Sequence, residues 1–269
     1  MKNFKDKICV ITGAASGIGL ALATELNHRN ARLILIDQNE EALNRATKDL
    51  ENVVHLRALD IRDKAGIESL AEYVQSKHGG ASLMINNAGV ALAENVNEMT
   101  DEDFHWVMDI NFWGMVNGSR AFLPQLQAQP DAALVNVSSL FGLIAVPTQS
   151  AYNASKFAIR GFTEALRQEV RSANVTVHSV HPGGVKTNIA RNARFHRGLD
   201  GKNDHGRFIE LFEKIAMTTP EKAANIILKG VSRRKPRILV GPDAVLLDLI
   251  QRITPTHYTR IVETLTKWA

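Results

Sequence analysis

Two polar side chains near the middle of the chain have a spacing that suits proton transfer. Tyr152 and Lys156 are four residues apart in a segment predicted to be helical, so they share one face of that helix. Ser139 lies 13 residues before Tyr152, just after a short β-rich run. A phenol titrates near ~10, and a nearby ammonium group favours its ionised form, which can act as a base. Taken alone, the Tyr152–Lys156 pair is better explained as an exposed helical pair.

A glycine-rich turn lies near the amino terminus. Residues 12–19 (TGAASGIG) separate a predicted strand from a predicted helix and include Gly13, Gly17 and Gly19. Glycine permits a tight turn close to a phosphate, and a helix start offers unpaired N–H groups to an anion. No Gly-Lys-Ser/Thr follows, so this is not the phosphate loop of NTPases. The pattern predicts a dinucleotide site, with a purely structural turn as the alternative.

Asp37 ends the second predicted strand, 18 residues after Gly19. A carboxylate at this place accepts hydrogen bonds from the hydroxyls of an adenosine ribose and repels a 2′-phosphate. The nearby Ala14, Ala15 and Gln38 carry no positive charge that would attract such a phosphate. The pattern predicts NAD rather than NADP; the alternative is an aspartate that only caps the next turn.

Short apolar runs alternate with longer amphipathic segments along the chain. Runs rich in β-branched residues predict strands over residues 7–12, 32–37, 53–58, 83–87, 133–138, 175–181 and 237–240. Helices are predicted over residues 17–30, 40–50, 64–77, 103–127 and 151–171. This order is typical of an α/β fold. We expect a single doubly wound (Rossmann) domain over residues 1–269, with a mostly seven-stranded parallel sheet and ligands at the carboxyl ends of its strands.

The composition is that of a globular protein. The chain has 269 residues, 45% apolar and 22% charged, and its one cysteine, Cys9, excludes an internal disulfide. Residues 132–155 are uncharged but too polar for a membrane span, and no secretory signal is apparent, so we expect a cytoplasmic protein. Residues 186–269 carry 16 Lys and Arg against 8 Asp and Glu, which favours a solvated basic face, an anionic substrate or a membrane surface. No motif supports binding of nucleic acid or zinc.

Taken together, the motifs resemble the short-chain dehydrogenase/reductase family over nearly the whole chain up to about Thr187. The resemblance rests on TGAASGIG, NNAG, NVSS, YNASK and PGGVKT, at residues 12–19, 86–89, 136–139, 152–156 and 182–187, with Asp60 and Asn111. It implies the catalytic roles: Tyr152 would be the general acid/base, and Ser139 would orient and polarise the substrate oxygen. Lys156 would bind the nicotinamide ribose, and Asn111 would hold a water that extends the proton path.

The resemblance also implies a cofactor site. Asp60 and Ile61 would flank the adenine, Asn87 would contact the cofactor, and Val185 and Thr187 would hold its nicotinamide end. The expected cofactor-binding set is Gly13, Ser16, Gly17, Ile18, Gly19, Asp37, Asp60, Ile61, Asn87, Tyr152, Lys156, Val185 and Thr187. No metal is expected.

Substrate selection is predicted to lie in the less regular segments. The insertion at residues 188–219 is basic and contains apolar residues, so it is a candidate substrate lid. Within it, Arg191, Arg194 and Arg197 recur every three residues and could bind an anionic handle or only form a solvated face. A helical extension is expected over residues 242–269, in two amphipathic runs at 245–253 and 258–268, which could cover the cleft, bind another subunit or touch lipid.

These features predict an NAD-dependent oxidoreductase that interconverts a secondary alcohol and a ketone, with a hydrophobic or lipid-like small molecule as substrate. The long helices at residues 103–127 and 151–171 resemble those that pair between subunits in this family, so a homodimer or homotetramer is expected. Two alternatives remain open at this point: an NADP-linked carbonyl reductase, and a non-catalytic nucleotide-binding sensor.

Overall fold

Seven parallel strands form the central sheet of the computed structural model, which describes residues 1, 3–171, 173–198 and 201–260. They are β1 (Ile8–Thr12), β2 (Arg32–Asp37), β3 (Val53–Ala58), β4 (Leu83–Asn86), β6 (Ala132–Val137), β7 (Val175–Pro182) and β9 (Arg237–Val240). Their order is β3-β2-β1-β4-β6-β7-β9. The chain winds outward from β1 to β3 and then returns to place β4 on the other side of β1. The predicted doubly wound sheet is confirmed, and its strand order reverses between β1 and β4.

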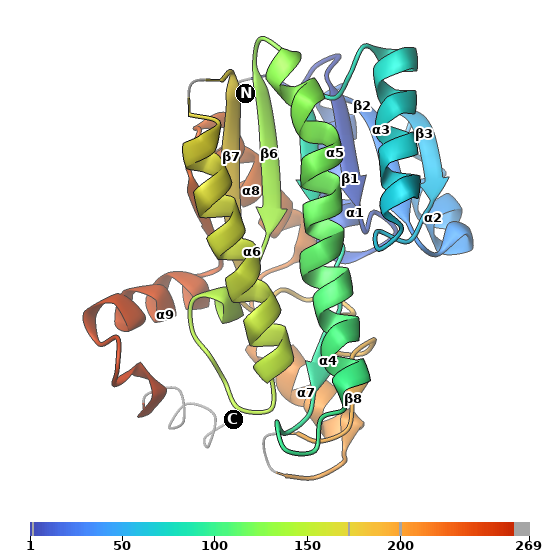
Figure 1. Cartoon of the computed structure of the whole chain (residues 1–269). Coiled ribbons are helices and arrows are strands. Elements are labelled where there is room, and N and C mark those ends of the chain that lie inside the picture. Colours follow the sequence, from blue (N-terminus) through green and yellow to red (C-terminus); the bar gives the residue numbers. More distant parts are fainter. Residues whose placement is uncertain (2, 172, 199–200, 261–269) are drawn as a thin grey trace.

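Helices cover both faces of this sheet (Figure 1). One face carries α1 (Gly17–His28), α2 (Glu40–Thr47) and α8 (Pro220–Ser232); the other carries α3 (Lys64–His78), α5 (Gly114–Ala128) and α6 (Ser150–Glu169). Leu22 of α1 and Ile227 of α8 are fully buried in the first layer, as are Ile67 of α3 and Phe122 of α5 in the second. Burial of each such side chain contributes about 1.5–3 kcal/mol, which explains why continuous apolar strands are needed.

Cys9 lies in the middle of β1 and is fully buried in the first layer. Burial raises the pKa of its thiol far above the ordinary value. The reactive thiolate is therefore absent at neutral pH, and Cys9 acts as a small apolar core residue.

The helix predicted over residues 103–127 is interrupted. It begins two residues earlier, as α4 (Asp101–Met108), because the Thr100 hydroxyl caps it by accepting a hydrogen bond from the Asp103 N–H at 3.1 Å. A π-helical turn, η1 (Asp109–Trp113), separates α4 from α5. Such a turn inserts one extra residue into the helix and often marks a functional site. Asn111 lies inside it.

The predicted lid has structure that its sequence pattern does not reveal. Its strand β8 (Arg194–Phe195) pairs in parallel with β5 (Leu92–Ala93), and neither was predicted because two residues carry no periodic signal. The helix α7 (His205–Ile215) follows; residues 199–200 of the lid lie outside the described residues.

The predicted carboxyl-terminal extension begins with α9 (Pro242–Ile253). Most of the second predicted run, at 258–268, lies outside the described residues, which end at 260. Within the described part of the chain, no helix combines the length and the apolar character needed to cross a membrane.

Candidate active site

The residues that the sequence pattern singles out gather at the carboxyl-terminal edge of the sheet. The glycine turn follows β1, Asp37 ends β2, and Asn87 follows β4. Ser139 follows β6, and Val185 and Thr187 follow β7. Because the strands are parallel, these loops meet at one edge, and α6 begins there (Figure 1), so its first two turns bring Tyr152 and Lys156 to it.

The glycine turn is locked against the end of β4. Gly13 and Gly17 have φ angles of 66° and 54°, in the left-handed region that favours glycine. A Cβ at Gly13 would lie 2.8 Å from the Cα of Ala88, and one at Gly19 would overlap the carbonyl oxygen of Gly13. The Asn87 side-chain amide donates to the carbonyl oxygen of Thr12 at 3.0 Å. Asn87 therefore stabilises the conformation of the glycine turn, a function that was not predicted alongside its contact with the cofactor.

The start of α1 has the chemistry of an anion site. Ser16 occupies the N-cap position and is exposed, and its hydroxyl makes no capping hydrogen bond within the described part of the chain. Ile18 packs against the first core layer and so holds the helix start in place. Thr187 lies beside the turn, with its Cγ2 3.1 Å from where a Cβ of Gly17 would be. A hydroxyl and unpaired helix N–H groups beside glycines fit the pyrophosphate of a dinucleotide.

Asp37 faces this turn from the end of β2. One carboxylate oxygen accepts from the Ala15 N–H and the other from the Asn39 N–H, both at 3.1 Å. Each oxygen retains acceptor capacity for a further donor. Capping of the turn and binding of a ribose are therefore compatible functions of the same carboxylate.

Asp60 and Ile61 follow β3. The Asp60 carboxylate accepts from Arg62 Nε at 3.1 and 2.9 Å and from Nη2 at 2.6 Å, and these hydrogen bonds hold the pKa of Asp60 below its ordinary value. Ile61 is 8% exposed and packs against Gly114. Its carbonyl oxygen accepts from Asn117 Nδ2 at 3.1 Å. Arg62 is thus a partner of Asp60 that was not predicted from the sequence.

Tyr152 and Ser139 are neighbours in the site. Ser139 follows β6 and caps a short 3₁₀ turn, η2 (Leu140–Gly142), by accepting from the Phe141 N–H at 3.0 Å. The Tyr152 side chain is buried and lies beside the Ser139 side chain. Burial raises the pKa of Tyr152 to about 12, although the polar Ser139 side chain acts in the opposite direction. The phenol is therefore protonated at neutral pH.

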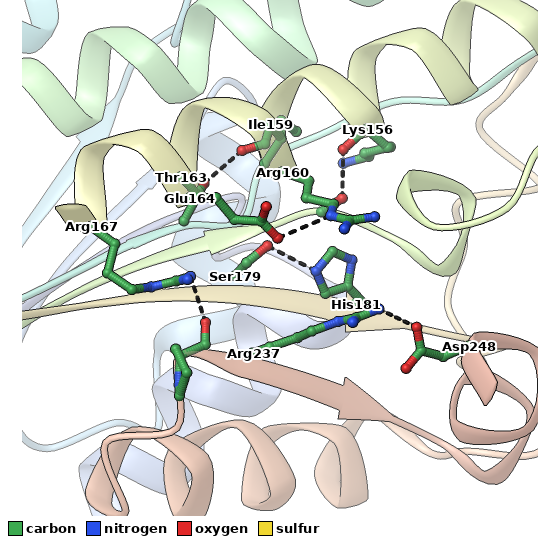
Figure 2. A network of polar contacts seen from close by, with 12 residues as sticks. Lys156, Ile159, Arg160, Thr163, Glu164, Arg167, Ser179, His181, Arg237 and Asp248 are labelled. Carbon is green, nitrogen blue, oxygen red and sulfur yellow. Dashed lines mark hydrogen bonds and ion pairs between the residues drawn. The ribbon is translucent and has the colours of Figure 1, made fainter. Parts of the chain in front are cut away.

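Lys156 lies one helical turn further along α6, also buried. Its Nζ donates to the carbonyl oxygen of Val137 at 3.3 Å (Figure 2) and lies 5.5 Å from the centroid of the Tyr152 ring. Burial lowers the pKa of Lys156 to about 8, so it is largely protonated at pH 7. From the sequence, this ammonium was expected to lower the Tyr152 pKa. In the protein itself, the loss of solvent around the phenol is the dominant effect on the Tyr152 pKa.

Asn111 is held on three sides within η1. Its Nδ2 donates to the carbonyl oxygen of Val90 and to Ser155 Oγ, both at 3.0 Å, and its Oδ1 accepts from the Val90 N–H at 2.8 Å. A Cβ at Gly89 would lie 3.0 Å from Asn111 Oδ1 and 3.3 Å from Lys156 Nζ, so both groups border one spot. Both amide protons of Asn111 are already donated to Val90 and Ser155, so beside Gly89 its side chain can only accept a further hydrogen bond, at Oδ1.

A buried histidine supports the main chain of Ser139. His181 Nδ1 lies 3.0 Å from the Ser139 carbonyl oxygen, and Nε2 lies 2.9 Å from Ser179 Oγ (Figure 2). Burial lowers the pKa of His181 to about 3, so the ring is neutral. It therefore donates from Nδ1 and accepts at Nε2. This contact was not predicted; the polar alternation Ser179–His181 in an apolar strand was the available signal.

Two of the family-like motifs form a buried polar network below the site. Asn86 Nδ2 donates to Asn136 Oδ1 at 2.8 Å, and Asn136 Nδ2 donates to Thr163 Oγ1 at 3.0 Å. Ser138 Oγ donates to the Lys156 carbonyl oxygen at 2.7 Å. These hydrogen bonds connect β4, β6 and α6, and they fix the position of Lys156 relative to Ser139.

The loop after β7 is held by two distant segments. The Gly184 N–H donates to Asp243 Oδ2 at 2.6 Å, at the start of α9. The Lys186 N–H donates to the Thr218 carbonyl oxygen at 2.9 Å, and Val185 between them is 3% exposed. The predicted cofactor residue Val185 is thus fixed by both the lid and the carboxyl-terminal helix.

Asp103 of α4 anchors the lid. Its carboxylate accepts from Arg194 Nη1 at 2.7 Å and lies 3.1 Å from His196 Nε2. The Arg194 guanidinium also lies 4.0 Å from the centroid of the Trp106 ring. Burial acts to raise the pKa of Asp103, but the hydrogen bonds from Arg194 and Thr100 hold it below its ordinary value.

The other lid arginines are paired as well. Arg191 forms an ion pair with Glu213, and Arg197 Nε lies 2.9 Å from Glu98 Oε2. Together with Arg194, all three predicted anion-binding arginines already have a carboxylate partner. The arrangement favours a clamped lid over a site for an anionic handle.

The cluster as a whole is suited to acid–base chemistry on an oxygen atom. A buried phenol, a hydroxyl and an ammonium lie beside a turn that fits a dinucleotide. The described residues contain no group of three or more side chains arranged to hold a metal. A cavity of about 620 Å³ between α3 and α5 shares no residue with this cluster, so chemistry rather than cavity size locates the site.

Comparison with known proteins identifies the family to which the chain belongs. The short chain dehydrogenase family model matches residues 7–198. A Mycobacterium tuberculosis protein named as a putative oxidoreductase, SadH, is 44% identical over 97% of this chain and 96% of its own length. A Lactiplantibacillus plantarum protein named "CLA biosynthesis dehydrogenase/reductase" is 35% identical over 94% of this chain and 95% of its own. A Burkholderia phymatum short-chain dehydrogenase/reductase solved with NAD has a TM-score of 0.85 and 27% identity, over 94% of this chain and 95% of that one. The chain therefore belongs to the short-chain dehydrogenase family of oxidoreductases.

Proposed function

We propose that the protein is an NAD-dependent oxidoreductase that interconverts a secondary alcohol and a ketone, with Tyr152 as general acid/base. The observation that carries this proposal is the buried Tyr152 phenol beside the Ser139 side chain, one helical turn from the Lys156 ammonium. In that arrangement, a substrate oxygen that contacts both hydroxyl groups has a proton donor and a polarising group at once.

Tyr152, Ser139 and Lys156 have distinct roles in the proposed reaction. The nicotinamide cofactor, when bound, supplies the hydride chemistry in either direction. In reduction, Tyr152 donates its proton to the carbonyl oxygen while the Ser139 hydroxyl stabilises the charge developing there. In alcohol oxidation, the phenolate of Tyr152 takes the hydroxyl proton. Lys156 stabilises that phenolate and passes protons toward the polar spot that it shares with Asn111.

NAD is the proposed cofactor because the chain offers a carboxylate, Asp37, beside the glycine turn. A carboxylate there repels a 2′-phosphate by like charge. The related Burkholderia phymatum enzyme solved with NAD supports this choice. Ser16 and Thr187 would hold the phosphate region, and Val185 would border the nicotinamide end.

A hydrophobic substrate is favoured by the side chains around Tyr152. The Phe141 ring packs edge-on against the Tyr152 ring at 6.1 Å between centroids. Leu140, Leu143 and Ile144 form an apolar cluster in the same loop. The relative named for CLA biosynthesis is consistent with an apolar alcohol or ketone.

We also propose a homodimer or homotetramer, since Trp113 and Phe157 are 52% and 39% exposed on helices facing outward.

Replacement of Tyr152 by Phe tests the catalytic assignment, because it removes only the hydroxyl group. General acid–base catalysis contributes about 10²–10⁴-fold, so turnover should fall by about that factor or more, with NAD affinity unchanged. Turnover is followed by the absorbance of reduced nicotinamide across a panel of hydroxylated lipids, steroids and small diols, and NAD binding by calorimetry. Tyr73→Phe on α3 is the matched control and should retain activity.

Two outcomes would contradict the proposal. Near-normal turnover in Tyr152→Phe would remove Tyr152 from the chemistry. A wild-type protein that binds NAD but turns over no alcohol or ketone with either cofactor would favour a nucleotide sensor instead.

A further inference from the structure

The outward face of α9 carries exposed apolar side chains. Val245, Leu246, Leu249 and Ile253 have exposed fractions of 53%, 56%, 53% and 70%. Their spacing places all four on one stripe of the helix. Large apolar side chains exposed as a contiguous group mark an interaction surface, whereas single exposed ones do not.

The opposite face of the same helix is firmly attached. Asp248 is 6% exposed and forms an ion pair with Arg237 of β9 (Figure 2), and Leu247 packs with the apolar cluster around Leu140. Asp243 accepts from the Gly184 N–H at 2.6 Å. The apolar stripe is therefore held outward by its anchored side, and Figure 1 shows α9 extending away from the body of the sheet.

A positively charged groove adjoins the stripe. Val245 lines a groove of about 400 Å³ together with Lys229, Arg233, Lys235 and Arg237. Asp248 compensates Arg237, but Lys229, Arg233 and Lys235 are exposed and have no ion pair within the residues that the structure describes. The stripe and these three cations together are called the α9 surface below.

Charge decides which partner fits the α9 surface. A second copy docked about a two-fold axis through the groove would bring three uncompensated cations against three identical ones, which is unfavourable. An anionic lipid bilayer matches both parts: the acyl region takes the apolar stripe, and the headgroups take the cations. The helix has 12 residues, about 18 Å at 1.5 Å per residue, which is too short to cross about 30 Å of hydrocarbon.

We propose that the α9 surface docks on an anionic lipid bilayer, with α9 lying in the plane of the interface. This docking does not depend on the oxidoreductase chemistry. It gives the charge excess of residues 186–269 a physical function, because Lys229, Arg233 and Lys235 all belong to that basic part of the chain.

Vesicle flotation of the full chain tests this docking. We expect binding to vesicles of phosphatidylcholine and phosphatidylglycerol in equal parts, little binding to phosphatidylcholine alone, and release by high salt. Replacement of Lys229 and Lys235 by Gln should weaken binding about 25-fold, at about five-fold per cation. Replacement of Leu246 and Leu249 by Ser should weaken it by at least about 10-fold.

Matched controls lie outside the α9 surface. Val96→Ser removes a side chain that is 73% exposed, and Lys48→Gln removes an exposed charge after α2; both should bind like wild type. The proposal is overturned if wild type ignores anionic vesicles, binds neutral ones equally well, or is matched by the Leu246/Leu249 variant. It is also overturned if wild type does not bind vesicles and that variant instead lowers the oligomeric mass in light scattering, since a second copy then covers the stripe.

Discussion

Replacing Lys156 by Met should make the protein more stable while removing its activity. The folded protein lowers the Lys156 pKa from 10.5 to about 8 by burial, so the charged form is destabilised by about 3 kcal/mol at 1.36 kcal/mol per pKa unit. Methionine has a similar length and carries no charge. It leaves the Val137 carbonyl oxygen without its donor, at a cost of about 1 kcal/mol. The net gain is about 2 kcal/mol at pH 7.

The sign of the pH dependence follows from proton binding. Between pH 8 and 10.5 the unfolded chain binds a proton at Lys156 that the folded chain has already lost, so wild-type stability rises with pH in this window. The variant has no such group. Its advantage over wild type should therefore be full near pH 7 and shrink as the pH rises toward 10.5.

Thermal and urea unfolding of both proteins across this pH range give the measurement. The variant should melt about 4–8 °C higher than wild type at pH 7. Lys77→Met, at an exposed position of α3, should change little. A Lys156→Met protein that is less stable than wild type at pH 7, or one whose stability difference does not change with pH, would refute the reasoning from burial.

Two further predictions concern the cofactor and the lid. Asp37→Asn keeps an acceptor for the Ala15 N–H but removes the charge that repels a 2′-phosphate. The ratio of kcat/KM for NADP to that for NAD should therefore rise at least about 10-fold, because a charged hydrogen bond contributes about 1.5–3 kcal/mol. An unchanged ratio would argue against binding of the ribose by Asp37. Asp103→Asn removes the anchor of Arg194, so trypsin should cleave the lid faster and the KM for substrate should rise while that for NAD does not. Glu213→Gln, which breaks a half-exposed pair with Arg191, should leave both unchanged.

The parts of the fold that could be predicted from the sequence are those with a local signal. Strands β2, β3 and β9 have their predicted ends because short β-rich runs stop where turn residues begin. The site residues gather as expected because parallel strands place their carboxyl ends at one edge. The start of α4 also has a local signal, the capping pair Thr100 and Asp103, although the predicted helix begins only at residue 103.

The remaining features depend on contacts between distant residues. Arg194 and Asp103 are 91 positions apart, and His181 lies 42 positions from Ser139, so no spacing reveals either pair. The spacing of the lid arginines therefore resembles an anion site, whereas in the fold each has a carboxylate partner. The direction of the Tyr152 pKa shift could not be predicted for a related reason. Helical spacing indicates that an ammonium group lies nearby, but the dominant effect is the loss of solvent around the phenol, which spacing does not report.

The burial of Cys9 within β1 has a practical consequence for labelling. The chain contains one thiol, and that thiol is both inaccessible and protonated, so a maleimide dye added to the native protein has no site of attack. A cysteine introduced at an exposed position, such as Val96 or Ile253, can thus carry a single fluorophore without prior removal of a native one. An environment-sensitive dye at Ile253 would then report directly on the polarity around the end of α9.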